Sequence, residues 1–266
     1  AESYSMDAET YYLTGCVALA MDSYDEASSN FTEAYGEDAT YDRAIQIYEA
    51  YLEKDMEADG TRYLEAALKT EAKNAEDYCN RGKVYYYMED YSNAQKELTE
   101  AVNQKSTEGM LLLGMVYRAQ GDTSNARSMY QQYVSADDSE PAKGYNGLAL
   151  CDMDDGSYDS ALENISKGLE DASTEEMQDL LFNEIVVYEK KLDFATALSK
   201  MQEYIKMFPD DENAAKELTF LQSRNGELSN DTASDTTENT DAEAASDAGD
   251  TTDTPDGSDE SGEEEY

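Results

Sequence analysis

Small residues recur along the chain at intervals of 32 to 36 positions, and this repeat constrains the fold more than any other feature. The first series falls at Gly15, Ala50, Gly82, Gly114, Ala149 and, as a departure, Ile185. A second series falls at Ala27, Ala66, Ala94, Ala126, Ala161 and Ala197, twelve residues after the first series in every unit but the second. Two antiparallel helices can approach closely only where the facing side chains are short. The repeat therefore predicts six stacked helix pairs within residues 1–208.

Large side chains repeat around these small residues. In five of the six units an aromatic residue precedes the second-series alanine by three positions, and in five a large apolar residue follows it by four. Examples are Tyr24, Tyr91 and Phe194 before, and Phe31, Leu98 and Met201 after. Spacings of three and four place these side chains on one helix face.

Two units depart from the common spacing. In the second unit the two small residues lie sixteen apart, which we interpret as one extra helical turn near Asp55–Asp59. Gly60 is expected to lie in the turn between the two helices of that unit, as Gly121 and Gly156 do in theirs. In the fifth unit Gly147 competes with Ala149 as the first small residue.

The pattern resembles the tetratricopeptide repeat, a helix-turn-helix unit with small residues at its eighth and twentieth positions. The third unit matches the family's large and small positions well, with Tyr78, Gly82, Tyr85, Tyr91, Ala94, Leu98 and Ala101. The resemblance implies an all-α, right-handed superhelical solenoid of about six units. An irregular helical bundle is the alternative, but a bundle does not require small residues at a fixed offset in successive pairs.

In the family, the first helices of the pairs line a concave wall that binds protein partners. The resemblance places these candidate peptide-binding residues there: Tyr12, Tyr51, Lys54, Lys83, Tyr86, Met115, Arg118, Lys143 and Asn146. The resemblance places further residues on the same wall, namely Cys16, Leu19, Ile47, Cys79, Leu111, Leu150, Met153, Phe182, Val186 and Glu189. Aromatic and thioether groups suit an extended peptide, and the cations could pair with its acidic groups. The alternative is that Tyr and Met fill packing gaps while the Lys stems lie along them.

The composition excludes several classes of function. The chain has no His, 19 basic residues against 61 acidic ones and a formal net charge of −42. Histidine-dependent catalysis and His-ligated zinc are therefore excluded, and binding to nucleic acid or an anionic lipid surface is disfavoured. No phosphate loop, nucleophile elbow or dinucleotide fingerprint is found, so we expect neither an enzyme nor a cofactor.

One acidic stretch invites a metal interpretation. Asp152, Asp154, Asp155 and Asp159 surround Gly156, and calcium favours several oxygen ligands at a sharp turn. The spacing does not fit an EF-hand loop, so we interpret these residues as the turn between two helices and predict no metal site. The three cysteines, Cys16, Cys79 and Cys151, are expected to be buried as small apolar residues.

The end of the chain differs from the repeats. Residues 209–226 predict a capping helix, with Ala214, Leu218 and Leu221 on its apolar face and Gly226 after its end. Residues 227–266 contain 15 acidic and no basic residues, which predicts a disordered acidic tail. The first 226 residues still carry 46 acidic and 19 basic residues, so the repeats themselves are acidic.

From the sequence we expect a non-catalytic scaffold that binds a protein or an extended peptide, an acidic one included, on the concave wall. The alternative is a structural or self-assembling cell-surface element that uses the acidic tail as a spacer. No apolar run reaches the length that spans a bilayer. The low Lys content and the Asp/Thr/Ser-rich tail favour an extracytoplasmic bacterial protein, exported or lipid-anchored, over a cytoplasmic one.

Overall fold

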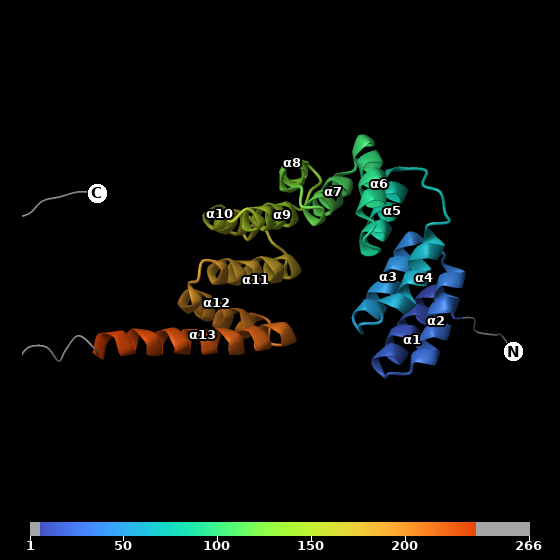
Figure 1. The fold of residues 1–266 in the computed structure, drawn as a ribbon. Coiled ribbons are helices and arrows are strands. Elements are labelled where there is room, and N and C mark those ends of the chain that lie inside the picture. Colours follow the sequence, from blue (N-terminus) through green and yellow to red (C-terminus); the bar gives the residue numbers. More distant parts are fainter. Residues whose placement is uncertain (1–5, 238–266) are drawn as a thin grey trace, which may run out of the picture.

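The computed structural model describes residues 6–237 of the 266, and this range contains thirteen α-helices and no β-strand. The helices are α1 (Ala8–Ala20), α2 (Tyr24–Glu37), α3 (Tyr41–Leu52), α4 (Glu57–Ala67), α5 (Ala75–Tyr87), α6 (Tyr91–Asn103), α7 (Thr107–Ala119), α8 (Thr123–Val134), α9 (Pro141–Asp154), α10 (Tyr158–Gly168), α11 (Thr174–Lys190), α12 (Phe194–Met207) and α13 (Glu212–Thr237). The first twelve form six antiparallel pairs, which Figure 1 shows stacked into an arch that ends in α13. The predicted all-α solenoid is confirmed.

The turns within the six pairs share one backbone feature. Each contains a single residue with a left-handed backbone, at Asp22, Asp55, Glu89, Gly121, Gly156 and Leu192, with φ between 54° and 78°. This conformation reverses the chain after the first helix. An aspartate precedes the second helix of three pairs and caps its N-terminus. The side chains of Asp90, Asp122 and Asp193 each accept a hydrogen bond from the backbone N–H three residues later.

Small residues allow each pair to pack closely, as the sequence predicts. A Cβ added to Gly15, Gly82 or Gly114 would lie 2.6, 2.3 and 2.7 Å from the side chains of Phe31, Leu98 and Tyr130, respectively. In each case the large residue lies sixteen positions after the glycine and is buried. The glycine therefore provides the space that the large side chain of the second helix fills.

The second pair contains no extra helical turn, so that prediction is wrong. The left-handed residue Asp55 lies seven positions after Tyr48, which is the offset found from Gly15 to Asp22. Gly60 lies twelve positions after Tyr48, inside α4 rather than in a turn, and a Cβ there would lie 2.9 Å from the Tyr48 Cα atom. The two sizes are therefore exchanged, with the large residue on the first helix and the small one on the second. The spacing of twelve residues between the two helices is preserved, from Tyr48 to Gly60. Ala50 lies two residues after Tyr48, which occupies the position that Gly15 occupies in the first pair.

The structure also decides the register of the fifth pair. Gly156 has a left-handed backbone and lies seven positions after Ala149, so Ala149 occupies the close-packing position. Gly147 faces the preceding pair instead, where an added Cβ would lie 2.5 Å from the Tyr130 ring.

The last helix packs on the sixth pair through Ala214 and Leu221, which are buried with Met201 and Tyr204. It continues through Gly226 to Thr237, so the predicted end at Gly226 and the predicted start of the tail at residue 227 are wrong. Gly226 lacks the positive φ with which Gly121 and Gly156 end a helix. The expectation of disorder for residues 238–266 lies outside the described residues.

We expect the packing of α13 to depend on pH through Glu189 of α11. Its Oε1 atom is buried and has no hydrogen-bond partner. Burial and then the charge of Glu217 on α13 raise the pKa of Glu189 to about 7, above an ordinary value of 4.5. Because the folded state binds this proton more tightly, the stabilisation is complete below pH 4.5 and is lost as the pH rises through about 7.

The measurement is the thermal midpoint of wild type and Glu189→Gln between pH 4.5 and pH 8. The midpoint of the wild type should fall by a few °C more than that of Glu189→Gln, which cannot ionise. Glu163→Gln, at an exposed position on α10, serves as the control and should follow the wild type. Equal slopes for Glu189→Gln and the wild type would contradict this role of Glu189.

Candidate functional site

A hollow lies among the first helices of three successive pairs, α5, α7 and α9, and extends to α8 and α11. It has a volume of about 720 Å3. Its lining is Tyr86, Leu111, Met115, Arg118, Ala119, Gly121, Thr123, Tyr130, Lys143, Asn146, Gly147, Leu150, Asp154 and Asp179. We call this hollow the central groove.

Apolar groups form the floor and one side of the central groove. Tyr130 is almost fully buried beneath it, in a cluster with Leu111 and Met115. Tyr86 is half-buried, and its ring lies 5.8 Å from that of Tyr91. The tyrosine rings are large and rigid, and the Met115 side chain is adaptable. Both kinds of group suit contact with the side chains of a partner.

Arg118 on α7 forms an ion pair with Asp154 of the next pair. Its Nε donates to one carboxylate oxygen at 2.6 Å, and its Nη2 to the other at 3.3 Å. Burial opposes the charged form, but the hydrogen bonds and charge of Asp154 outweigh burial and raise the pKa of Arg118. The guanidinium is therefore charged and held in place at the edge of the groove.

Two other polar residues of the central groove, Lys143 and Asn146, are also paired. Lys143 donates to Glu140, and this hydrogen bond raises the pKa of the lysine. The Asn146 side-chain oxygen accepts a hydrogen bond of 2.7 Å from the Asn183 amide of α11. Burial, followed by the charges of Glu175 and Glu176, raises the pKa of the Asp179 carboxyl.

A second hollow of about 390 Å3 continues the central groove toward α13. Its lining is Asn146, Leu150, Gln178, Asp179, Phe182, Asn183, Tyr204, Asp211 and Asn213. Asn146, Leu150 and Asp179 line both hollows. The two hollows therefore form one surface that runs along the stack of first helices from α5 to α13.

Five of the nine predicted site residues line the central groove, namely Tyr86, Met115, Arg118, Lys143 and Asn146. Lys83 lies outside it and forms an ion pair of 3.7 Å with Glu49. Tyr12 packs near Phe31 with the Arg43 guanidinium 4.9 Å from its ring, and Lys54 lies 3.9 Å from Asp22 at the end of α3.

Tyr51 is wrong as a wall residue, because its side chain is only 1% exposed and packs edge-on against Phe31. The cause is the shifted register of the second pair, which places Glu49 on the wall instead. There Glu49 accepts a hydrogen bond from the Tyr87 hydroxyl at 2.5 Å. Leu19, Ile47 and Cys79, predicted on the same wall, are buried as well.

Seven lining residues of the central groove were missed by the sequence prediction, and the three with large or charged side chains are Asp179, Asp154 and Tyr130. Asp179 occupies the same repeat position as Lys143, six residues before Ile185 and Ala149 respectively, so the repeat could have identified it. Asp154 and Tyr130 reach the groove from positions that the family pattern assigns to a turn and to a second helix, and no sequence signal identifies them.

The aspartates around Gly156 form ion pairs with basic side chains of this chain. Asp152 and Asp155 pair with Arg127 at 2.7 and 2.8 Å, and Asp159 pairs with Lys191 at 2.6 Å. Asp152 is buried and also accepts a hydrogen bond from the Asn164 amide. No cluster of three metal-ligating side chains occurs within residues 6–237. The stretch therefore joins neighbouring helices through ion pairs.

None of the helices within residues 6–237 is both long enough and apolar enough to span a membrane.

A family model described as the tetratricopeptide repeat matches residues 79–141 and 111–176. The fold is similar to the crystal structure of a tetratricopeptide repeat protein from Parabacteroides merdae, with 15% identity, a TM-score of 0.63 and coverage of 83% of this chain and 86% of that one. It is also similar to PilW, described as a widely conserved type IV pilus biogenesis factor, with 14% identity, a TM-score of 0.53 and coverage of 79% and 98%.

A third similar structure is a chain of the APC/C hetero-tetramer Cut9–Hcn1, with 17% identity and a TM-score of 0.52. The match covers 81% of this chain but only 42% of that one, so this chain spans less than half of its length. No curated protein matches in sequence. At these identities the likeness concerns the fold.

Proposed function

The chain is a tetratricopeptide-repeat protein, and from this premise we propose that it is a non-catalytic scaffold that binds a protein partner, as an extended segment, in the central groove. The observation that carries the proposal is the continuity of the groove. Tyr86, Met115 and Lys143 come from three successive pairs and line a single hollow, which the second hollow extends. A segment lying in the two hollows would contact the third to the sixth pair in turn.

The lining favours contact with both the side chains and the backbone of a peptide. Tyr86, Leu111, Met115 and Leu150 offer apolar surface. The amides of Asn146 and Asn183 can donate and accept hydrogen bonds, as a peptide backbone requires. Affinity would then rest on apolar and amide contacts.

Charge would contribute to orientation. The two cations of the groove, Arg118 and Lys143, are already paired with Asp154 and Glu140. An acidic group of a partner would therefore have to take the place of these carboxylates. Because exchanged ion pairs at partly exposed sites contribute little net energy, acidic groups would set the direction of the peptide more than its affinity.

Selection of a displayed random-peptide library on the full chain tests the proposal. The selected peptides are measured against the wild type and against Arg118→Glu with Lys143→Glu. We expect this double variant to weaken binding at least tenfold, because each substitution sets two carboxylates side by side, at Asp154 and at Glu140, and so disturbs the groove itself. The control is Lys167→Glu with Lys206→Glu, which changes the net charge equally at exposed positions on α10 and α12, and should change binding less than about twofold. Equal effects of both double variants, or failure to select any peptide, would contradict the groove as the binding site.

A further inference from the structure

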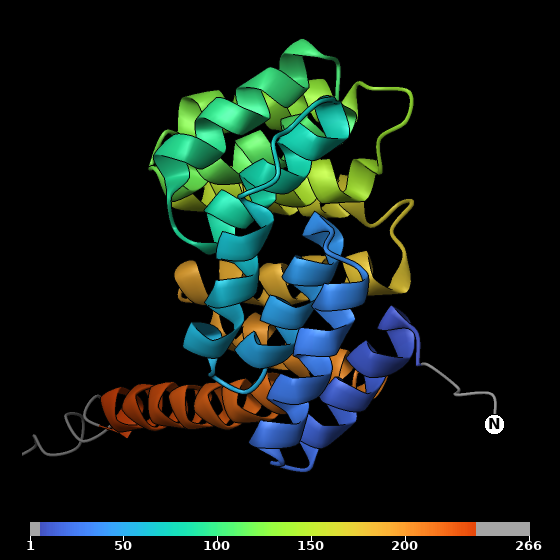
Figure 2. The same ribbon diagram turned by 90° about the vertical axis from the view of Figure 1, so that its right-hand side faces the viewer.

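One carboxylate lies where the two hollows of the candidate site meet. Asp179 of α11 lines both the central groove and the second hollow, together with Asn146 and Leu150 of α9. In Figure 1 and in Figure 2, α9, α11 and α13 follow one another along the stack. A segment that continues from one hollow into the other therefore lies against Asp179, the charged residue that both hollows share.

Asp179 differs from the other charged groups of the central groove. In the described part of the chain, no hydrogen bond or ion pair reaches its carboxylate. Arg118 is paired with Asp154 at 2.6 Å, and Lys143 is paired with Glu140. The cations of the groove are therefore neutralised by this chain, whereas the charge of Asp179 is not.

Asp211, the other acidic residue of the second hollow, has a structural role. Its carboxylate accepts hydrogen bonds from the Tyr204 hydroxyl at 2.7 Å and from the backbone N–H groups of Asn213 and Ala214 at 2.9 and 3.0 Å. These hydrogen bonds, that of Tyr204 above all, lower the pKa of Asp211. Asp211 is therefore occupied in capping the start of α13.

The start of a helix does not account for Asp179. At the same position in the repeat, Glu76 and Glu108 are the second residues of α5 and α7, where a negative charge stabilises the N–H groups of the first turn. The longer helix α11 begins at Thr174, so Asp179 lies in its second turn. The charge of Asp179 therefore has no evident role in the fold.

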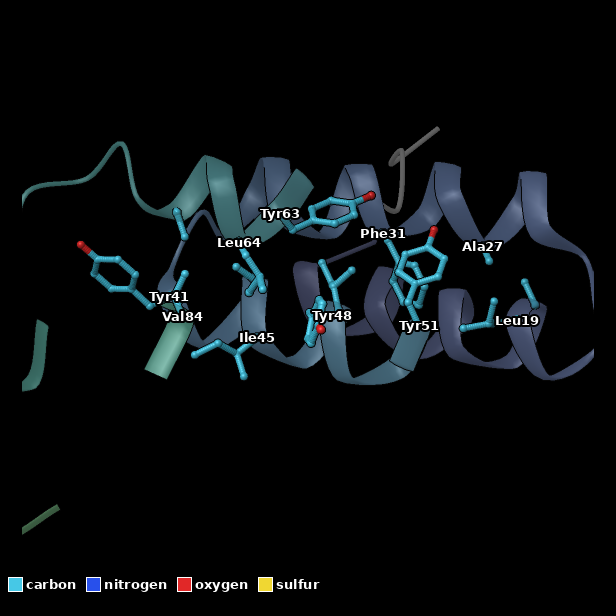
Figure 3. Close-up of a cluster of buried hydrophobic side chains, with 14 residues drawn as sticks. Leu19, Ala27, Phe31, Tyr41, Ile45, Tyr48, Tyr51, Tyr63, Leu64 and Val84 are labelled. Carbon is cyan, nitrogen blue, oxygen red and sulfur yellow. The ribbon is translucent and has the colours of Figure 1, made fainter. Parts of the chain in front are cut away.

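A carboxylate on the wall of an earlier pair has a partner within the chain. Glu49 lies on α3 beside Tyr48 and Tyr51, which Figure 3 shows in the core of the first pairs. Its carboxylate pairs with Lys83 of α5 at 3.7 Å. Here, as at Asp154, a basic residue of a neighbouring pair supplies the positive charge that Asp179 lacks.

The surroundings of Asp179 favour a cation. The residue is open to solvent along the groove, but partial burial of its carboxyl by the groove walls, followed by the charges of Glu175 and Glu176, raises its pKa. Each of these causes disfavours the negative charge, and a positive charge at this point would offset them.

Asn183 offers a second acceptor for the same cation. It lies four residues after Asp179, on the same face of α11, and lines the second hollow. Its amide nitrogen donates to Asn146 at 2.7 Å, which leaves the Asn183 oxygen to accept a hydrogen bond from a ligand.

We propose that the partner segment carries one basic side chain, a lysine or an arginine, which pairs with Asp179 between the two hollows. Its charged group donates to the Asp179 carboxylate and the Asn183 oxygen, and its aliphatic stem lies along Leu150 and Phe182. This inference rests on the proposed function and adds the sign of the charge that the groove recognises. That sign is opposite to the one expected from the basic residues of the wall.

The peptides selected by display on the full chain test this chemistry. We expect their aligned sequences to share one Lys or Arg at a fixed position between apolar residues. Asp179→Asn should weaken their binding at least fivefold, because it keeps the shape of an exposed side chain and removes its charge. Glu163→Gln, which removes one negative charge from an exposed position on α10, is the matched control and should change binding less than about twofold.

A charge exchange separates a direct contact from general attraction to an acidic chain. The basic residue of a selected peptide is replaced with Glu, which should weaken binding to the wild type. Asp179→Lys should then bind the Glu peptide more tightly than the wild type does, and bind the parent peptide less tightly.

The outcomes distinguish this inference from the proposed function. Selected peptides that lack a basic residue, or that bind Asp179→Asn as tightly as the wild type, would overturn the inference. The proposed function would stand if Arg118→Glu with Lys143→Glu still weakened the same peptides. Equal weakening by Asp179→Asn and Glu163→Gln, or no recovery in the charge exchange, would also overturn the inference. Failure to select any peptide would overturn both.

Discussion

Replacement of Tyr130 with alanine is expected to lower the free energy of unfolding by about 3 to 5 kcal/mol, the range found when a large buried aromatic side chain is removed. The ring lies between two glycines, Gly114 of its own pair and Gly147 of the next, and an added Cβ at either would come within 2.7 Å of it. The ring packs against α7 at Gly114 and against α9 at Gly147, so its removal takes away contacts with two neighbouring pairs at once. We therefore expect a loss in the upper part of this range.

Urea unfolding followed by circular dichroism measures the effect, through a lower midpoint at an unchanged slope. Tyr130→Phe is the matched control, since it keeps the ring and removes the hydroxyl, and it should cost less than about 1 kcal/mol. An equal loss in both variants would show that the hydroxyl, rather than the volume of the ring, stabilises this junction. Because Tyr130 also forms the floor of the central groove, Tyr130→Ala should weaken the binding of selected peptides while Tyr130→Phe retains it.

The fold could be predicted from the sequence because its steric requirement recurs at a fixed position. Gly15, Gly82 and Gly114 are small for the same reason, namely that a large side chain from the second helix occupies the space above them. The prediction failed in the second pair, where Tyr48 and Gly60 exchange sizes. The prediction looked for a small residue on the first helix, and in this pair the small residue lies on the second. The left-handed residue of this turn is Asp55 rather than a glycine, so the sequence does not mark the turn either.

The groove could be predicted only where the register was correct. Tyr86, Met115 and Asn146 come from pairs that follow the common spacing, and they line the groove. Tyr51 comes from the shifted pair and is buried. The ion pair between Arg118 and Asp154 joins residues 36 positions apart, and it depends on how two neighbouring pairs are staggered. That stagger is set by side-chain packing between the pairs, which the repeat pattern does not encode.

The role of the basic residues predicted on the concave wall could not be inferred from their residue type alone. Lys54, Lys83, Arg118 and Lys143 each lie within 4 Å of a carboxylate of this chain. In a chain with 61 acidic and 19 basic residues, a cation without an acidic neighbour is uncommon on statistical grounds alone. A peptide that binds here would therefore be selected more by its apolar side chains than by its charge.

Replacement of Gly82 with valine is expected to lower the free energy of unfolding by about 2 kcal/mol, as insertion of extra carbon atoms into a closely packed site does. A Cβ at this position would lie 2.3 Å from the Leu98 Cγ, and Leu98 is fully buried, so its side chain has no room to move aside. Valine has a slightly better helix propensity than glycine, but the gain of a few tenths of a kcal/mol is smaller than the cost of the clash.

Gly36→Val is the matched control, because Gly36 also lies within a helix but an added Cβ would find no atom within 4 Å. It should change the free energy of unfolding by less than about 0.5 kcal/mol. Urea unfolding of the two variants and the wild type compares the same substitution at the two positions. If both valines destabilise the chain equally, the loss comes from the helix backbone and the close approach of α5 and α6 at Gly82 does not set the repeat. A loss confined to Gly82→Val would tie the spacing of small residues directly to the packing of each pair.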